Sequence, residues 1–326
     1  MKKFFTLALC AVWLLPFALT ACGKKSDTAL KLGIGVYATA KATDATADGD
    51  GKGQAVLTGA ALLIDESGRI VQCRLDCADH TASYTADGKA IATDSFSTKY
   101  EMGTDYGMKA YGGAAKEWFE QADAFCELVK GKTLAEVMAL VASDRKGTDE
   151  VIRAGCTVTV SEFVKAIEKA FANAKETDAA ASDTLRLGIS TAQTVRDATA
   201  DAAGQNQLET TFFAAAIGAD GRITAAYSDC AEINFKFDES GVSASKGETA
   251  VTTKRDAGPD YGMKTYGGAA KEWFEQADAF DKACIGKQPG EIPTLLRDNG
   301  YGVSGLQQAG CTIRVSEFAK AAAKIG

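Results

Sequence analysis

The chain contains two copies of one long segment. Residues 105–125 read DYGMKAYGGAAKEWFEQADAF, and residues 260–280 repeat these letters with one difference, Thr265 in place of Ala110. The similarity extends outward on both sides, where three more pairs of segments correspond: 30–48 with 185–201, 66–70 with 219–223, and 154–163 with 309–318. Two copies of such a long unit indicate tandem duplication of a whole domain, because solenoids stack short repeats in larger number.

The duplication sets the domain boundaries that we predict. Repeat 1 covers residues 30–176, repeat 2 covers residues 185–326, and the Ala- and Ser-rich stretch 177–184 links them. Each repeat has about the size of an ordinary single domain.

The order of patterns within a repeat predicts its fold class. In repeat 1 we expect, in order, strands in 30–40 and 55–64, a hairpin turn at Glu66-Ser67-Gly68, a strand from 69, a helix over 114–130 ended by Gly131, a helix over 133–141, a strand over 155–160, and a helix capped by Ser161. This order predicts an α+β fold in which helices pack on a small antiparallel sheet.

The first residues have the pattern of a targeting segment. Lys2 and Lys3 precede an apolar run that ends in Leu19-Thr20-Ala21-Cys22. This pattern resembles the bacterial lipobox, in which the signal peptide is cut before the cysteine and that cysteine is lipidated. We therefore expect a signal peptide over 1–21, membrane lipid attached at Cys22, a polar tether over 22–29, and a location on the extracytoplasmic face of the cell membrane.

Charge and composition exclude several classes of protein. The net charge is −7, and it becomes 34 − 43 = −9 when Lys2 and Lys3 leave with the signal peptide. Such an acidic chain is a poor partner for nucleic acid, since phosphate contacts need clustered Lys and Arg. His80 is the single histidine, it has no counterpart in repeat 2, and we expect it in a solvated loop. A hydrolase with a Ser-His-Asp set in each repeat is therefore excluded.

Two glycine-containing motifs are better explained by structure than by ligand binding. Gly33-Ile34-Gly35 lacks the third glycine of a dinucleotide loop and lies within a predicted strand, so we expect it to serve backbone packing. The acidic stretch 45–53 lacks the glutamate that closes a calcium loop and is not preserved in repeat 2. We expect a structural loop there and no metal site.

The cysteines leave two interpretations open. Both repeats contain Cys77 with its counterpart Cys230, and Cys156 with its counterpart Cys311. Export permits disulfides, which makes Cys77–Cys156 and Cys230–Cys311 the pairs to propose. The alternative is that these residues are small buried apolar side chains, as free cysteines often are.

The segment AGCT and the layout around it resemble a known family. A Gly-rich first strand, a hairpin with a Ser-Gly-Arg-Ile or Asp-Gly-Arg-Ile turn, a helical middle and a small-residue turn running into a helix are similar to the FMN-binding domain family of bacterial lipoproteins. In that family a flavin transferase, using FAD and magnesium, links the phosphate of FMN to the last Thr or Ser of the motif. The resemblance implies Thr157 and Thr312 as acceptors, with Gly155 and Gly310 before them. The family motif has Ser or Thr where this chain has Ala154 and Ala309, and Ala where it has Cys156 and Cys311.

The residues themselves are compatible with this chemistry. A threonine hydroxyl can form a phosphoester, glycine allows close approach to the backbone, and a helix start favours a phosphate. Tyr106 and Tyr111, like Tyr261 and Tyr266, could stack on the isoalloxazine ring. Trp118 and Trp273 are expected in the core, on the apolar face of their helices. Thr157 and Thr312 would also suit plain strand positions with nothing attached.

Two functions remain open at this point. The first is an electron carrier with an FMN in each repeat, which receives electrons from a membrane reductase and needs no general base, because the cofactor does the chemistry. The second is a surface lipoprotein that binds a ligand or a partner and has no redox role. We expect a carrier or binding protein rather than a catalyst.

Overall fold

The computed structural model describes residues 30–326, so the predicted signal peptide, Cys22 and the whole tether lie outside the described residues. Repeat 1 contains β1 (Lys31–Thr43), β2 (Gly51–Ile64), β3 (Ile70–Tyr84), β4 (Ala90–Ile91), α1 (Lys99–Met102), a 3-10 turn (Gly103–Tyr106), α2 (Trp118–Val129), α3 (Leu134–Met138), α4 (Asp149–Ala154), α5 (Ser161–Ala172) and β5 (Lys175–Glu176). Repeat 2 contains β6 (Thr184–Arg196), β7 (Gly204–Ile217), β8 (Ile223–Phe237), β9 (Thr249–Val251), α6 (Lys254–Ala257), a 3-10 turn (Gly258–Tyr261), α7 (Trp273–Cys284), a 3-10 helix (Pro289–Leu295), α8 (Ser304–Gln308) and α9 (Ser316–Ala323).

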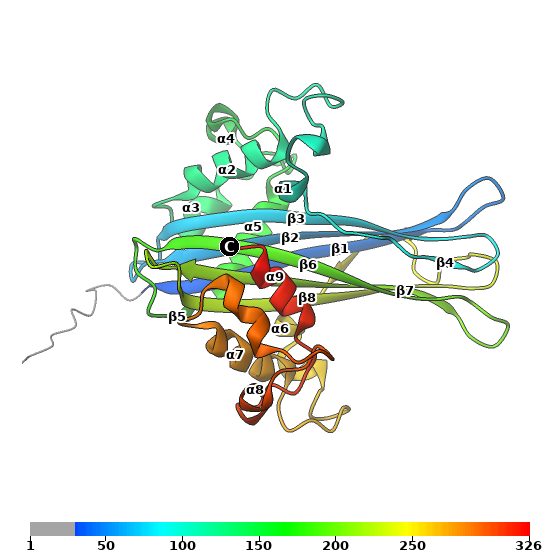
Figure 1. The fold of residues 1–326 in the computed structure, drawn as a ribbon. Coiled ribbons are helices and arrows are strands. Elements are labelled where there is room, and N and C mark those ends of the chain that lie inside the picture. The colour runs from blue at the N-terminus through cyan, green and yellow to red at the C-terminus, as the bar shows by residue number, and fades with distance from the viewer. Residues whose placement is uncertain (1–29) are drawn as a thin grey trace, which may run out of the picture.

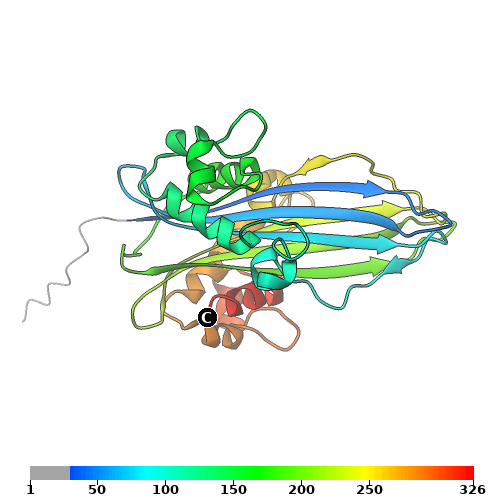
Figure 2. The ribbon, with the colours of Figure 1, turned by 90° about the horizontal axis from the view of Figure 1, so that it is seen from above.

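The α+β class is confirmed, and the two repeats form one layered body. β1, β2 and β3 make one antiparallel sheet, and β6, β7 and β8 make the other. The sheets face each other, the helices of repeat 1 cover the outer face of the first, and those of repeat 2 cover the outer face of the second (Figure 1). The strands also extend well beyond the helices at one end (Figure 2). At 13 to 15 residues they are much longer than we predicted for a small sheet.

Successive side chains of a strand point to opposite sides of the sheet, and both sides are buried. In β1, Leu32, Ile34 and Val36 point into the core between the sheets. Gly33 and Gly35 point the other way, where a Cβ on either would come within 2.1 or 2.2 Å of a backbone oxygen of α5. The prediction that this motif serves backbone packing is confirmed, because the glycines let α5 lie directly on the strand.

Residues at equivalent positions of the two repeats meet where the sheets pack. The rings of Tyr84 and its counterpart Phe237 stack with their centroids 4.3 Å apart. Gly59 lies under its counterpart Phe212, and a Cβ on Gly59 would be 2.6 Å from that ring. The two repeats are therefore complementary rather than identical at their contact, since one provides the space that the other fills.

Ion pairs also join the two repeats, and they do so reciprocally, with a lysine of each repeat bound to a carboxylate of the other. Lys169 of α5 pairs with Asp256 of α6, and its counterpart Lys324 pairs with Glu101 of α1 at 2.7 Å. β9 of repeat 2 pairs antiparallel with β1 of repeat 1. The two repeats thus share strand pairing and ion pairs as well as a core.

Several local predictions are confirmed. The turns between β2 and β3 and between β7 and β8 contain Gly68 and Gly221 with φ of 75° and 78°. Thr133 caps α3, where its side chain accepts from the N–H of Glu136. Trp118 and Trp273 are buried.

Other local predictions are wrong. Residues 155–160 form an irregular link between α4 and α5 and not a strand, because Gly155 ends α4 with φ 95° and the pairing in this segment is a single antiparallel bridge from Thr159 to Lys146. Ser161 is the first residue of α5 and makes no cap, since Val160 holds that position. The long helix begins at Trp118 and not at residue 114, because Glu117 and Glu120 form a capping box.

The expectation of a solvated histidine is also wrong. His80 lies on β3 between the two sheets and is only 5% exposed. Its Nε2 is 3.0 Å from Oγ1 of Thr191, and its ring packs on Phe96. Burial lowers the pKa of His80 to about 4, so the ring is neutral at physiological pH.

We predict that replacing Gly35 by Ala destabilises the protein by about 3 kcal/mol, because the new methyl meets the backbone of α5. Replacing Gly49 by Ala is the matched control, since a Cβ there meets no atom within 4 Å, and it should stay within about 0.5 kcal/mol of the wild type. Urea denaturation of both variants tests this, and equal midpoints would contradict the packing role of Gly35.

Candidate functional site

A cavity in repeat 1 brings together several residues that the sequence singled out. It has a volume of about 350 Å³. Its walls are Thr58, Cys77, Lys99, Tyr106, Met108, Trp118, Lys146, Thr157, Val158, Thr159, Glu162 and Phe163. β2 and β3 form its floor, α1 and the following turn bring Lys99 and Tyr106, and the link before α5 brings Thr157.

Thr157 is exposed, and its hydroxyl is held in place by a buried glutamine. Its backbone N–H and its Oγ1 donate to Oε1 of Gln121, over 2.7 and 3.0 Å. Thr312 donates in the same way to Gln276, over 2.8 and 2.9 Å. Each glutamine is 1% exposed. Both repeats therefore present the same threonine in the same fixed geometry.

Sequence reasoning missed the two glutamines. Each also donates through Nε2 to the backbone oxygen of Lys116 or Lys271, so its amide orientation is fixed. The available signal was a polar residue on the apolar face of a predicted helix, within the segment that both repeats share. An uncharged amide in a core needs partners, and here the partner is the threonine.

Gly155 and Gly310 have a more specific role than simple access. Each ends a helix with φ of 95° or 100°. A Cβ on either would lie 2.2 Å from the ammonium nitrogen of Lys116 or Lys271. The glycines thus turn the chain toward the threonine and leave room for a lysine that crosses beside it.

Of the predicted tyrosines, Tyr106 belongs to the cavity of repeat 1 and Tyr111 does not. Tyr106 lines it, with the ammonium of Lys99 5.0 Å from its ring centroid. Tyr261 has the same relation to Lys254 at 5.3 Å. Tyr111 and Tyr266 are 90% and 86% exposed and are not among the residues that form the cavity wall. Trp118 is buried, as expected, and its ring nevertheless forms one wall.

Lys99 is the best-shielded cation of the cavity. Its side chain is 14% exposed and its ammonium lies 3.1 Å from the carboxylate of Asp79. Burial works to lower the pKa of Lys99, but Cys77, Tyr106 and Asp79 outweigh burial and raise it. The group therefore stays charged at neutral pH, where it can attract an anion into the cavity.

Cys77–Cys156 and Cys230–Cys311, the two pairs proposed from the sequence, are unbonded in the structure, as are the other cysteines within residues 30–326. Cys77 lies on β3 with its sulfur 3.9 Å from Oγ1 of Thr58, Cys156 follows α4, and both belong to the same apolar core of repeat 1. Burial raises the pKa of Cys77 to about 12 and that of Cys156 to about 11, which keeps both thiols protonated.

Repeat 2 keeps the same framework with a different charge. Glu209 stands where repeat 1 has Val56. Lys254 is therefore bound by two carboxylates, Glu209 at 3.1 Å and Glu232 at 3.3 Å. The hydroxyl of Thr211, the counterpart of Thr58, is buried without a hydrogen-bond partner. An anion would find a more negative environment here than in repeat 1.

A buried aspartate positions the Lys99 side of the cavity. Oδ1 of Asp76 accepts from the N–H of Cys77 at 2.6 Å and from the N–H of Tyr100 at 3.1 Å, which joins β3 to α1. Asp229 repeats both contacts in repeat 2, at 2.7 and 3.1 Å. Burial raises the pKa of Asp76 to about 7 and that of Asp229 to about 6.

Two features are absent from the described residues. Within residues 30–326 there is no cluster of three or more His, Cys, Asp or Glu side chains that could hold a metal ion. In the same range, no helix combines the length and apolar character that crossing a membrane requires.

Comparison with known proteins gives one partial similarity. No protein-family model matches the chain, and no solved structure matches it. A chlorophenol reductase of Desulfitobacterium hafniense is 33% identical over 126 residues, which cover 34% of this chain. The match spans 38% of the length of that relative.

We predict that Asp76→Asn weakens the pH dependence of stability. Because the folded pKa of Asp76 exceeds its ordinary value, this group favours folding below about pH 4, and that contribution is lost as pH rises to about 7. Asparagine can accept the same two hydrogen bonds without ionising. Between pH 4 and 7 the variant should therefore lose about 1 kcal/mol less stability per pH unit than the wild type.

Urea denaturation at several pH values measures this difference. Asp48→Asn, at an exposed position, serves as the control and should follow the wild type. Parallel stability curves for the wild type and Asp76→Asn would show that burial does not shift the titration of this carboxyl.

Proposed function

We propose that this protein is an exported lipoprotein that carries FMN and transfers electrons at the membrane surface. Cys22 would hold it to lipid on the extracytoplasmic face. The phosphate of FMN would be esterified to Thr157 in repeat 1, and Thr312 is the equivalent acceptor in repeat 2.

The observation that carries this proposal is the position of Thr157. Thr157 is an exposed residue at a cavity that is lined by the rings of Tyr106 and Trp118 and by the cations Lys99 and Lys146. An esterified phosphate needs a reachable hydroxyl and positive charge, and a flavin ring needs an aromatic wall. The residues present fit both ends of the cofactor.

The chain's own groups have separate tasks in this proposal. Gln121 holds the hydroxyl in one orientation, Lys99 and Lys116 supply positive charge near the ester, and Tyr106 and Trp118 border the space for the ring. When bound, FMN supplies the capacity to accept and release electrons. None of these tasks requires a histidine, which agrees with the neutral, buried His80.

The partners follow from the same proposal. A flavin transferase would attach FMN from FAD to the threonine oxygen, and a membrane reductase would deliver electrons. The partial similarity to a protein named as a chlorophenol reductase supports a redox role and says nothing about the cofactor.

We predict that protein from its native host carries FMN on the tryptic peptide that contains Thr157. Thr157→Ala should abolish this addition, because the acceptor oxygen is lost, whereas Thr159→Ala, at another hydroxyl of the same cavity, should retain it. If local charge governs loading, occupancy of Thr312 is the lower of the two, because Glu209 makes that site more negative. Peptide mass spectrometry and visible absorbance measure both.

An unmodified mass with no flavin absorbance, in protein that still carries lipid on Cys22, would refute the electron carrier. That result would favour the second candidate, a lipoprotein that binds a ligand or partner without redox chemistry. The observation in its favour is that Tyr111 and Tyr266, which both repeats keep, are almost fully exposed. Exposed aromatic side chains are frequent in binding surfaces.

A further inference from the structure

Two cysteines that the sequence did not pair meet in the core of repeat 1. Cys73 lies on β3 and Cys126 on α2, and their sulfur atoms are 3.4 Å apart. Both residues are buried, at 3% and 2% exposure. A disulfide needs the sulfur atoms at about 2.05 Å, so the two atoms would have to move closer together by little more than 1 Å.

Repeat 2 lacks both of these cysteines. The positions equivalent to Cys73 and Cys126 are Ala226 and Asp281. Because the two copies share a common origin, the presence of both thiols in one and neither in the other indicates that the two positions act together.

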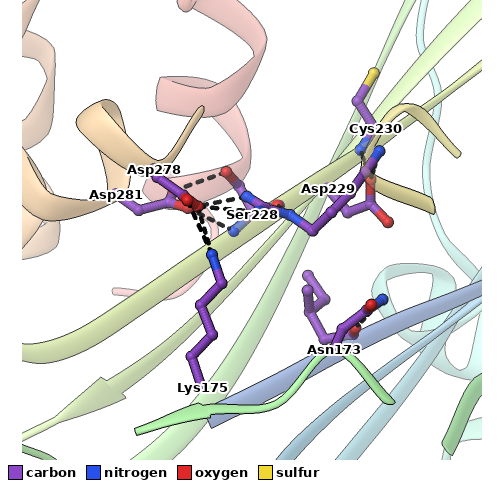
Figure 3. A network of polar contacts seen from close by, with 9 residues as sticks. Asn173, Lys175, Ser228, Asp229, Cys230, Asp278 and Asp281 are labelled. Atoms are coloured by element: carbon purple, nitrogen blue, oxygen red, sulfur yellow. Dashed lines mark hydrogen bonds and ion pairs between the residues drawn. The ribbon is translucent and has the colours of Figure 1, made fainter. Parts of the chain in front are cut away.

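In repeat 2 a polar network makes the same connection between helix and strand. The carboxylate of Asp281 accepts from the N–H of Ser228 at 3.0 Å and from its hydroxyl at 2.7 Å (Figure 3). The guanidinium of Arg255 lies 3.5 Å from Asp281 and donates to Asp278 at 2.9 Å. The carboxylate of Asp278 also accepts a hydrogen bond from the ammonium of Lys175, which belongs to the network seen in Figure 3.

Repeat 1 cannot build that network. Leu75 replaces Ser228, Tyr100 replaces Arg255, and Cys126 replaces Asp281. The geometry points to a disulfide between Cys73 and Cys126, which fastens α2 to β3 in repeat 1 where charged groups fasten α7 to β8 in repeat 2. This inference does not depend on bound flavin.

The chemistry is thiol–disulfide exchange with a disulfide donor, either oxidised glutathione or a protein oxidant in its disulfide form. The two cysteine thiols lose two protons and two electrons as the new sulfur–sulfur bond forms, and the donor's disulfide is reduced to two thiols. Burial raises the pKa of Cys126, so the packed thiol is a poor nucleophile. The bond should therefore form during folding, before α2 covers the strand.

The test refolds the reduced chain from residue 22 onward, with Cys22 replaced by Ser, in a glutathione redox buffer, then denatures it and alkylates the remaining thiols. We expect one disulfide that joins the peptides of Cys73 and Cys126, and alkylation of Cys77, Cys156, Cys230, Cys284 and Cys311. Alkylation of Cys73 and Cys126 as free thiols, or linkage of either to another cysteine, would overturn the inference.

A second measurement separates the bond from packing. The bond closes a loop of 53 residues, so its reduction should lower the midpoint of thermal unfolding by about 5 °C. Cys126→Ala should remove this sensitivity to reductant, and Cys77→Ala, the matched control on the same strand, should keep it. A wild type whose midpoint does not respond to reductant would count against a stabilising disulfide.

Discussion

The face-to-face packing of the two sheets is the contact on which the rest of the structure depends. It buries one side of every long strand, and it works because equivalent positions have diverged in opposite directions, with Gly59 receiving the ring of Phe212. Two copies with phenylalanine at this position would collide, and two with glycine would leave a cavity. The duplication therefore produced two halves that need each other, although each also packs its own helices.

Once the inner faces are buried, the helices must cover the outer faces, and this places the candidate site. Gly33 and Gly35 let α5 lie against β1, which brings the segment before α5, with Thr157, toward β2 and β3. Asp76 joins β3 to α1 and so brings Lys99 to the same cavity. The site is a consequence of how the helical layer sits on the sheet. The connection between β3 and α1 requires the carboxylate of Asp76 to be buried.

Comparison of the repeats distinguishes what is shared from what has changed. The threonine, its glutamine partner, the crossing lysine and the cavity tyrosine are present in both, which is why sequence comparison found the block that contains most of them. The charge around the cavity lysine and the fastening of the long helix differ. The side chains responsible, such as Glu209 and Cys126, lie far apart in sequence, so no local pattern reveals that they act at these contacts.

The sequence by itself determined the duplication, the α+β class and the hairpin turns, because turn chemistry, periodicity and repeated letters are local. It misplaced residues 155–160 as a strand, since a run of β-branched residues looks the same whether it pairs in a sheet or crosses a helical layer. Tertiary structure alone decided that β1 is covered on both sides, that His80 is buried between the sheets, and that Cys73 lies beside Cys126. These facts depend on which surfaces meet, and alternation shows only that a face is buried, not what buries it.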